Sequence, residues 1–159
     1  MNSIRQATID DLEIIVKMRI AFFEEMKNNP NIKDDSHFVQ KTREYFNKKL
    51  GNKDIIIWLI ERESFVVSTG GLILFEGAPT LKNVNGLEGY IFNMFTVSKY
   101  RRQGLSQIII NEIISYAKFN HISRLWLKST KDGFSGYLKN GFTLINGELD
   151  ENPHMELIF

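Results

Sequence analysis

Apolar residues along this chain gather in short runs, and the runs rich in aromatic and β-branched side chains predict β-strands. Residues 54–61 (DIIIWLIE) form the clearest run, and the short polar break Arg62-Glu63-Ser64 before residues 65–75 predicts a hairpin. Three glycines and a proline within residues 76–89 predict a loop. The other predicted strands are residues 3–7, 90–97, 123–128, 142–145 and 154–159.

Elsewhere the apolar residues recur with the period of an α-helix. Residues 8–11 (TIDD) have the pattern of a capping box, which predicts a helix start. The Asn-Pro-Asn segment within residues 28–35 is expected to end that helix, and Gly51 is expected to end the next one. A broad apolar face over residues 103–120 predicts a helix buried against a sheet. The predicted helices are residues 8–26, 36–50, 103–120 and 132–140.

The resulting order, β-α-α-β-β-β-α-β-α-β-β, is typical of a mixed α/β (α+β) fold in which hairpins lie beside a crossover. A length of 159 residues suits one domain with a sizeable core. The sequence holds no repeat and no low-complexity linker, so we expect a single domain over residues 1–159.

Composition narrows the class of protein. A hydrophobic share of 43%, a charged share of 25% and a net charge of +1 are ordinary for a globular protein and argue against a nucleic-acid or membrane partner. The chain has no cysteine, and its N-terminal segment has no apolar core like that of a signal peptide, so a cytoplasmic location is expected. The three histidines, His37, His121 and His154, lack metal-ligand spacing, so no metal site is expected.

The most informative segment for chemistry is residues 90–111, where a strand meets a basic glycine turn and then a helix start. The first turn of a helix has unpaired N–H groups and a positive dipole end, and glycine lets a phosphate approach the backbone. Arg101 and Arg102 add donors suited to phosphate oxygens. The segment therefore predicts an anion site over residues 101–107, with a plain solvated turn as the alternative.

Two motifs resemble the GNAT N-acetyltransferase superfamily. Arg101-x-x-Gly104-x-Ser106 after Phe95-Thr96-Val97 is similar to its acetyl-CoA signature, although Ser106 departs from the usual glycine or alanine. Tyr137 stands four residues before Gly141-Phe142, as a tyrosine does in that superfamily, and Thr130-x-x-Gly133 resembles one of its branches.

The resemblance implies a central mixed, mostly antiparallel sheet flanked by helices, and direct transfer from acetyl-CoA in a ternary complex without a metal. It implies that backbone groups of Phe95, Thr96 and Val97 hold the pantetheine and polarise the thioester. Residues 102–107 then hold the pyrophosphate, while Arg101 is at the first position of the motif. The expected cofactor-binding residues are Phe95, Thr96, Val97, Arg101, Arg102, Gln103, Gly104, Leu105, Ser106, Gln107, Thr130 and Tyr137.

The expected general acid is Tyr137, whose phenol can protonate a departing thiolate; the alternative is an ordinary core tyrosine. A base or proton path is also needed, because an alkylamine with a pKa of about 10.4 is almost fully protonated near neutral pH. Asn93 ranks first as a further catalytic-site residue because it is polar within an apolar strand. The other candidates for the base are Glu24, Glu25, Glu76 and Glu88.

The acceptor is expected to be a primary amine of a small molecule, and a protein N-terminus or lysine is the alternative. A non-catalytic acyl-CoA sensor is a second class of answer, and a nucleic-acid module using residues 99–102 is a weakly supported third. The closing strands offer an edge for a homodimer. The aromatic residues that could line the acceptor pocket or the core are Phe22, Phe23, Phe38, Tyr45 and Phe46.

Overall fold

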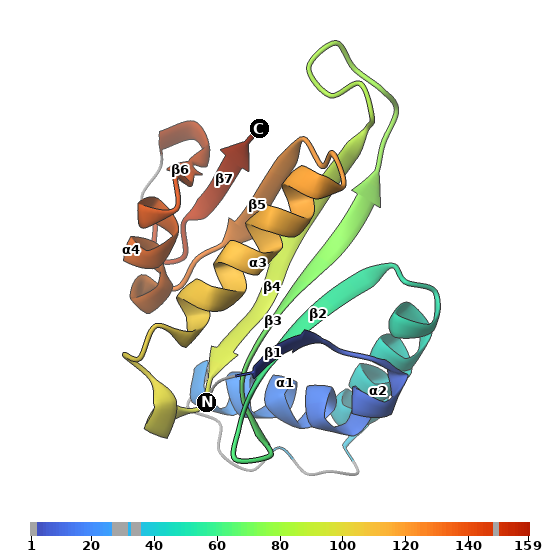
Figure 1. Ribbon diagram of the computed structural model, residues 1–159, viewed down its shortest axis with the longest axis vertical. Helices are drawn as coiled ribbons and strands as arrows, with labels where there is room; N and C mark the ends of the chain where they lie inside the picture. Colours follow the sequence, from blue (N-terminus) through green and yellow to red (C-terminus); the bar gives the residue numbers. More distant parts are fainter. Residues whose placement is uncertain (1–2, 27–31, 33–35, 148–149) are drawn as a thin grey trace. The chain divides into compact units, whose positions relative to one another are not determined.

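A computed structural model of the protein describes residues 3–26, 32, 36–147 and 150–159 (Figure 1). In this described part, seven strands form one sheet in the order β1-β2-β3-β4-β5-β7-β6. The sheet is mostly antiparallel, with β4 and β5 parallel, and four helices accompany it. The predicted order of elements and the predicted fold class are therefore confirmed.

The chain divides into two compact units, and both β3 and β4 pass from one unit to the other. Met1–Gly71 with Asn93–Ser106 forms the first unit, and Leu72–Phe92 with Gln107–Phe159 forms the second. Among the described helices, none has both the length and the apolar composition that crossing a lipid bilayer requires.

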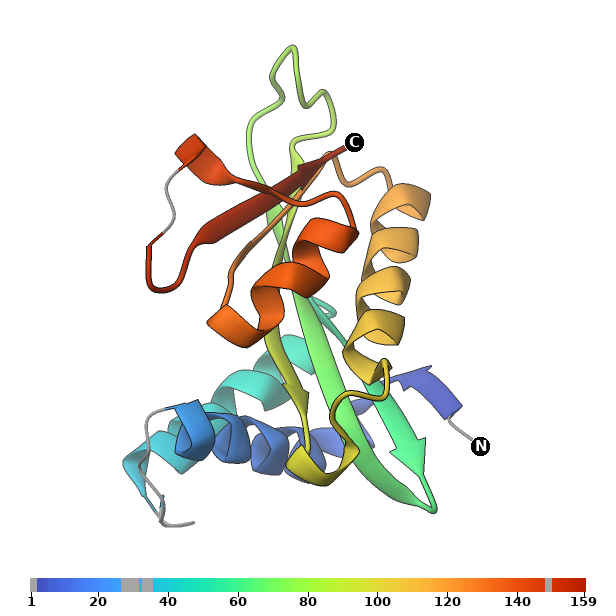
Figure 2. The ribbon, with the colours of Figure 1, turned by 90° about the vertical axis from the view of Figure 1, so that its left-hand side faces the viewer.

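In the first unit, two helices pack against each other (Figure 2), and the short first strand pairs antiparallel with β2 from Ser3↔Glu61 to Gln6↔Trp58. Thr8 and Asp11 form the predicted capping box in a 3₁₀ turn, and the Ser36 hydroxyl caps the second helix by accepting from Val39 N. The elements of this unit are β1 (Ser3–Gln6), α1 (Leu12–Met26), α2 (His37–Gly51), β2 (Ile55–Arg62), the first part of β3 (Phe65–Glu76) and the last part of β4 (Leu87–Thr96).

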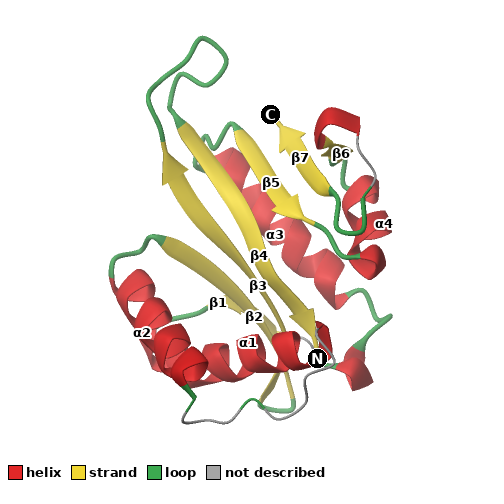
Figure 3. Ribbon diagram, turned by 180° about the vertical axis from the view of Figure 1, so that it is seen from behind, coloured by secondary structure: helices red, strands yellow, loops and turns green. Residues whose placement is uncertain are grey.

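In the second unit, β5 pairs with β4 on one side and β7 on the other (Figure 3). Its core is apolar: Ile109, Ile113, Leu125 and Met155 are fully buried, as the apolar face of the predicted helix requires. The elements of this unit are the last part of β3, the first part of β4, nearly all of α3 (Leu105–Phe119), β5 (Arg124–Lys128), α4 (Lys131–Lys139), β6 (Thr143–Leu144) and β7 (His154–Ile158).

Two differences from the predicted boundaries concern the loop before β4 and the final hairpin. The loop predicted over residues 76–89 is shorter, because the flanking strands run on to Glu76 and begin at Leu87. The final hairpin is also shorter, because a 3₁₀ turn, Ile145–Gly147, follows β6 directly. The predicted break at residues 28–35 lies outside the described residues, apart from Ile32.

Gly89 explains the first difference. The sequence placed this residue in the predicted loop, but it lies inside β4. A Cβ added there would lie 2.6 Å from Leu72 Cδ1 and 2.9 Å from Leu125 Cδ2. The glycine is therefore required by close packing on both sides and not by a turn.

Candidate functional site

Asn93, in β4, combines two features that are unfavourable in an ordinary strand. Its φ is +53°, in the left-handed region, and the residue is only 5% exposed. Its side-chain oxygen accepts a hydrogen bond from Arg19 Nη1 at 3.4 Å, while its Nδ2 has no partner among the described residues. A buried polar residue in a strained conformation is a frequent mark of a functional site.

Phe95, Thr96 and Val97, at the end of β4 and just beyond it, are held by hydrogen bonds to β3. Ser68 Oγ donates to Phe95 O at 3.1 Å and lies 2.7 Å from Thr96 Oγ1, and Val97 N donates to Val67 O at 3.0 Å. Because a carbonyl oxygen has a second lone pair, Phe95 O and Thr96 O can still accept from a ligand. The predicted pantetheine-binding stretch is thus braced by β3.

The side chain of Arg101 is directed toward β4 and α1, within the first unit. Its Nε donates to Thr96 O at 2.8 Å, and its guanidinium forms an ion pair with Glu25 at the end of α1. Its Cζ lies 5.7 Å from the centre of the Phe95 ring. The sequence left the direction of this side chain open, and in the structure the guanidinium connects the turn to β4 and α1.

The turn itself opens onto solvent. Arg102 and Gly104 have positive φ angles of 58° and 77°, and both residues are exposed. A Cβ added to Gly104 would meet nothing within 4 Å. Gln103 accepts a hydrogen bond from Arg62, whose guanidinium lies 5.7 Å from the centre of the Tyr100 ring. Backbone N–H groups and open space therefore precede the first turn of α3, where Leu105 is buried and Ser106 is exposed.

Gln107 belongs to a side-chain network of the second unit. Its Nε2 donates to Asn140 Oδ1 at 2.7 Å and to Asn111 Oδ1 at 3.1 Å. Asn140 Nδ2 in turn donates to Gly136 O at 2.7 Å. These bonds tie the start of α3 to the end of α4, so Gln107 has a positioning task in addition to the binding task predicted for it.

Tyr137 lies in α4 with only 7% of its surface exposed, and its ring packs edge-on against Phe142 at 5.6 Å. Burial raises the pKa of Tyr137 above the ordinary value for a phenol, and Tyr90 raises it further. No described residue forms a hydrogen bond with its hydroxyl. The phenol is therefore protonated at neutral pH, as a hydrogen-bond donor to a leaving group must be.

Thr130 caps α4, since its Oγ1 accepts from Gly133 N at 3.2 Å. A Cβ added to Gly133 would lie 3.2 Å from Tyr137 Cε2, so this glycine leaves room for the tyrosine ring. The Thr-x-x-Gly motif thus has a structural task in positioning α4 and Tyr137.

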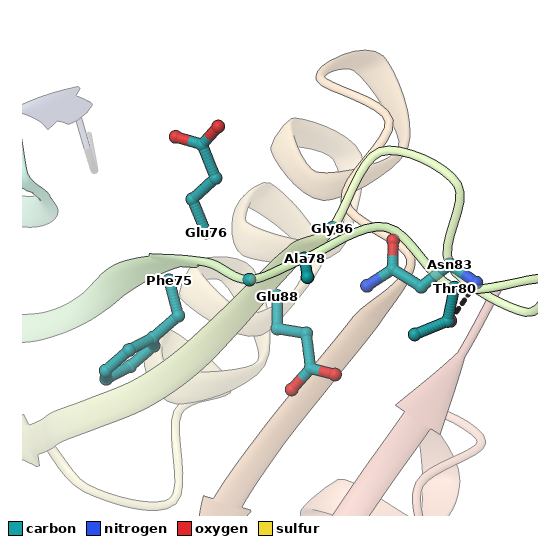
Figure 4. A pocket seen from close by; sticks show the side chains of 8 residues that line it. Phe75, Glu76, Ala78, Thr80, Asn83, Gly86 and Glu88 are labelled. Atoms are coloured by element: carbon teal, nitrogen blue, oxygen red, sulfur yellow. Dashed lines mark hydrogen bonds between the residues drawn. The ribbon is translucent and has the colours of Figure 1, made fainter.

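Three of the four glutamates considered as the base have hydrogen-bonding partners. Glu24 accepts from Ile32 N at 3.1 Å, Glu25 pairs with Arg101, and Glu88 lies 3.2 Å from Arg124. Glu76 and Glu88 line a cavity of about 230 Å³ beside the β3–β4 loop, within the second unit (Figure 4). Each of these three carboxylates thus already accepts a hydrogen bond or forms an ion pair within the protein.

The aromatic residues proposed for an acceptor pocket form ring contacts in the first unit. Phe22 packs edge-on against Phe95 at 6.3 Å and against Phe23 at 5.3 Å, and Phe23 packs against Phe38 at 5.3 Å. Phe46 is 1% exposed and belongs to the core. The cluster near β4 is thus Phe22, Phe23 and Phe38.

Two side chains near the end of β4 were missed by sequence reasoning, namely Arg19 and Ser68. Arg19 follows the buried Ile15 and Val16 at helical spacing, so a charge at that point of the apolar face was a usable signal. Ser68 carried no signal, because its partner Thr96 lies on another strand.

The family model described as the Acetyltransferase (GNAT) family matches residues 19–142. The chain belongs to the GNAT acetyltransferase family, which confirms the resemblance, and acetyl transfer from acetyl-CoA is the class of reaction that this membership indicates. No protein with a curated description matches the sequence.

Solved structures share the fold. A predicted acetyltransferase from Clostridium acetobutylicum, solved with acetyl-CoA, is 26% identical with a TM-score of 0.82, and the match covers 94% of this chain and 95% of that one. A GCN5-related N-acetyltransferase from Ralstonia eutropha is 22% identical with a TM-score of 0.80, over 94% and 97% of the two chains. The PaiA N-acetyltransferase from Thermoplasma acidophilum, solved with coenzyme A, is 16% identical with a TM-score of 0.70, over 100% and 99%.

Proposed function

We propose that this protein transfers the acetyl group of acetyl-CoA to a primary amine of a small molecule, by direct transfer in a ternary complex. The observation that carries the proposal is the exposed turn before α3, where Arg102 and Gly104 adopt left-handed backbone conformations. Family membership and the acetyl-CoA and coenzyme A complexes of two similar structures support it.

The turn has the properties that a pyrophosphate needs. Alternation of backbone conformation turns successive N–H groups toward one side, and the positive end of the helix dipole adds to their attraction for an anion. The open space at the missing Cβ of Gly104 lets phosphate oxygens approach the backbone. We assign phosphate binding to residues 102–107 and pantetheine binding to the backbone of Phe95, Thr96 and Val97.

For the chemical step, the acceptor nitrogen attacks the thioester carbonyl carbon, the carbon–sulfur bond breaks, and the amide forms. We assign Tyr137 as the group that donates its phenolic proton, in full or as a hydrogen bond, to the departing sulfur. Its burial and its raised pKa keep the proton in place until then. The nitrogen loses one proton, and since three glutamates are already paired, we assign its first acceptor to a water molecule near Asn93. This proton replaces, through solvent, the one that Tyr137 gave to the sulfur, so the phenol is restored.

We further propose that residues 1–159 act as one acetyltransferase domain with a cytoplasmic location. The family match runs from residue 19 to residue 142, through segments of both units, which supports a common function for them. Transfer to a protein N-terminus or lysine, and acyl-CoA sensing without turnover, are the competing functions. Homodimer formation through the closing strands is a separate proposal, which size-exclusion chromatography tests.

A pair of glycines gives a matched test of the turn. Gly104 and Gly147 have φ angles of +77° and +70°, and a Cβ at either position meets nothing within 4 Å. Alanine at either position should therefore cost a similar ~1 kcal/mol of stability. Only Gly104→Ala should weaken acetyl-CoA binding, by ~10-fold or more in calorimetric titration, because its methyl group fills the space left for phosphate.

Two results of the acetyl-CoA titration would contradict the proposal. Equal affinities in the two variants would remove the turn assignment, and absence of binding by the folded wild-type protein would remove the acetyltransferase function. Binding without turnover on a panel of small amines, peptides with free N-termini and lysine peptides would instead favour the sensor.

A further inference from the structure

The hydroxyl of Tyr137 is not held in place by a hydrogen bond to any of the described residues. Its position therefore depends on where α4 places the backbone of this residue and on how the ring packs. The α4 helix has 9 residues, a length that is marginal for an isolated helix in water, so contacts within the second unit must fix it. A reacting group that is misplaced by about 1 Å can cost ~10²-fold in rate, so these contacts bear on the proposed chemistry.

The N-terminal end of α4 is fixed by residues that come shortly before Tyr137 in the chain. Thr130 caps the helix, and Gly133 leaves room for the tyrosine ring. Ser129 N donates to Pro153 O at 2.9 Å, which ties this end of α4 to the segment just before β7. The N-terminal end is thus attached to its neighbours without any contribution from α3.

The C-terminal end of α4 is held by Asn140 through three groups. Its backbone N–H donates to Tyr137 O at 2.9 Å, its Nδ2 donates to Gly136 O at 2.7 Å, and its Oδ1 accepts from Gln107 Nε2 at 2.7 Å. Phe142 N also donates to Tyr137 O, at 3.2 Å. The carbonyl of Tyr137 and the carbonyl of the residue before it therefore both bond to one asparagine, and that asparagine is bound to α3.

Asparagine is well suited to this position. A carbonyl oxygen can only accept, so the atom that faces Gly136 O must be the Nδ2 donor, which leaves Oδ1 for Gln107. The same Gln107 Nε2 also reaches Asn111 Oδ1, one turn further along α3, at 3.1 Å. A bond from Asn140 to Gly136 O alone would be an ordinary closure of a helix end. The additional bond to Gln107 connects two helices, so a role beyond helix closure is indicated.

We propose that Asn140 is a positioning residue for the acetyl transfer: together with Gln107 it holds the backbone around Tyr137, so that the phenol meets the departing sulfur. This inference rests on the proposed function, because Tyr137 is the proton donor assigned there. Gln107 lies in the segment assigned to phosphate binding, so one side chain would serve both the cofactor and the proton donor.

Asn140→Ala tests the inference because it removes the bonds to Gly136 and Gln107 and leaves Tyr137 present. At saturating acetyl-CoA we expect kcat to fall by ~10-fold or more. The KM for the acceptor and the calorimetric affinity for acetyl-CoA should change by ~2-fold at most. In a Tyr137→Phe background the same substitution should change kcat by only ~2-fold or less, because no phenol is left to misplace. A residue that only stabilises the fold would slow both backgrounds equally.

Asn111→Ala is the matched control, because it removes the other acceptor of Gln107 Nε2 and changes no contact of α4. Its kcat should stay within ~2-fold of the wild-type value, since the lost bond joins two turns of one helix. Gln107→Met breaks the bond between the helices but keeps the bond from Asn140 to Gly136 O. It should lower kcat at saturating acetyl-CoA by ~3-fold or more, and only while Tyr137 is present.

The position of the phenol is measured directly in crystal structures of the wild-type protein and of Asn140→Ala. After superposition on β5 and β7, which belong to the same unit, the Tyr137 hydroxyl should be displaced by about 1 Å or more, or lose its order. Asn111→Ala should leave the hydroxyl in place. This measurement does not depend on turnover.

The two measurements distinguish failure of this inference from failure of the proposed function. If the Tyr137 hydroxyl keeps its position in Asn140→Ala, or if Asn140→Ala slows the Tyr137→Phe protein as much as the wild type, the inference is overturned. If Asn140→Ala does not fold, Gln107→Met is judged by the same two criteria. If the wild-type protein acetylates no amine, the proposed function fails, and the crystal structures alone decide whether Asn140 positions Tyr137.

Discussion

The two parts of β4 differ in how regular their structure is. Up to Phe92 the strand pairs regularly with β5, from Glu88↔Arg124 to Tyr90↔Trp126, and Gly89 is enclosed by Leu72 and Leu125. From Asn93 onward the strand carries a residue with a left-handed backbone and a buried donor that has no partner within the described part of the chain. Side chains, Ser68 and Arg101, bond to its carbonyls there.

The difference between the two parts of β4 distinguishes features that packing explains from features that function explains. In the first part every feature reduces the free energy of the folded chain, so stability alone accounts for it. In the second part, strain and an unsatisfied amide raise that free energy, so a ligand is the simpler account. Tyr137 adds a third case: it is a buried polar residue in a regular helix, and its ring packs against Phe142 while its hydroxyl has no hydrogen-bond partner among the described residues.

The largest expected effect is the loss of activity on replacing Tyr137. Turnover should fall, whereas the free energy of unfolding should not. Tyr137→Phe keeps the ring against Phe142 and breaks no hydrogen bond to the described residues. We expect kcat to fall by ~10²-fold with acetyl-CoA affinity nearly unchanged. Because the raised pKa keeps the phenol protonated, the loss should be similar between about pH 6 and 9.

Steady-state assays with the preferred amine measure this change, and Tyr45→Phe is the control because Tyr45 is an exposed residue of α2. Full turnover by Tyr137→Phe would remove the tyrosine from the mechanism and leave it a core residue.

The next effect is a loss of stability in the regular part of β4. Gly89→Ala places a methyl group within contact distance of two fully buried leucines, Leu72 and Leu125. We expect the free energy of unfolding in urea to fall by about 2 kcal/mol, because the leucines must leave their rotamers. Unchanged stability would mean that the close packing at Gly89 is not a constraint.

The smallest effect tests the second part of β4 and has the opposite sign. Asn93→Gly removes the strain and the unsatisfied donor, and part of the gain is offset by the flexibility of glycine in the unfolded chain. We expect the free energy of unfolding to rise by about 1 kcal/mol while turnover falls. A less stable Asn93→Gly protein would show that asparagine supports the fold, and the contrast between the two parts of β4 would fail.

Local sequence was enough for most elements of the fold and for the position of the basic turn before α3. The caps at Ser36 and Thr130 accept from N–H groups three residues away, and Asp11 accepts from Thr8 N. Glu63 and Ser64 both adopt the positive φ angles of a tight hairpin. Such interactions depend on neighbours in the chain, so the pattern of residues predicts them directly.

The candidate site could be predicted in part. Asn93 stood out as a polar residue in an apolar strand, and the Arg101–Gln107 segment as a basic turn before a helix. The sequence did not reveal Arg19 as the partner of Asn93, nor Glu25 as the partner of Arg101, because these pairs are 74 and 76 residues apart.

The sequence by itself thus determined where strands, helices and the basic turn before α3 lie, since hydrophobic period, caps and glycines act over a few residues. Only the tertiary structure decided that Gly89 belongs inside a strand, that Arg101 turns back to α1, and that Asn93 keeps an unused donor. The physical reason is that these features arise from contacts between distant segments, and no local pattern specifies which segments meet.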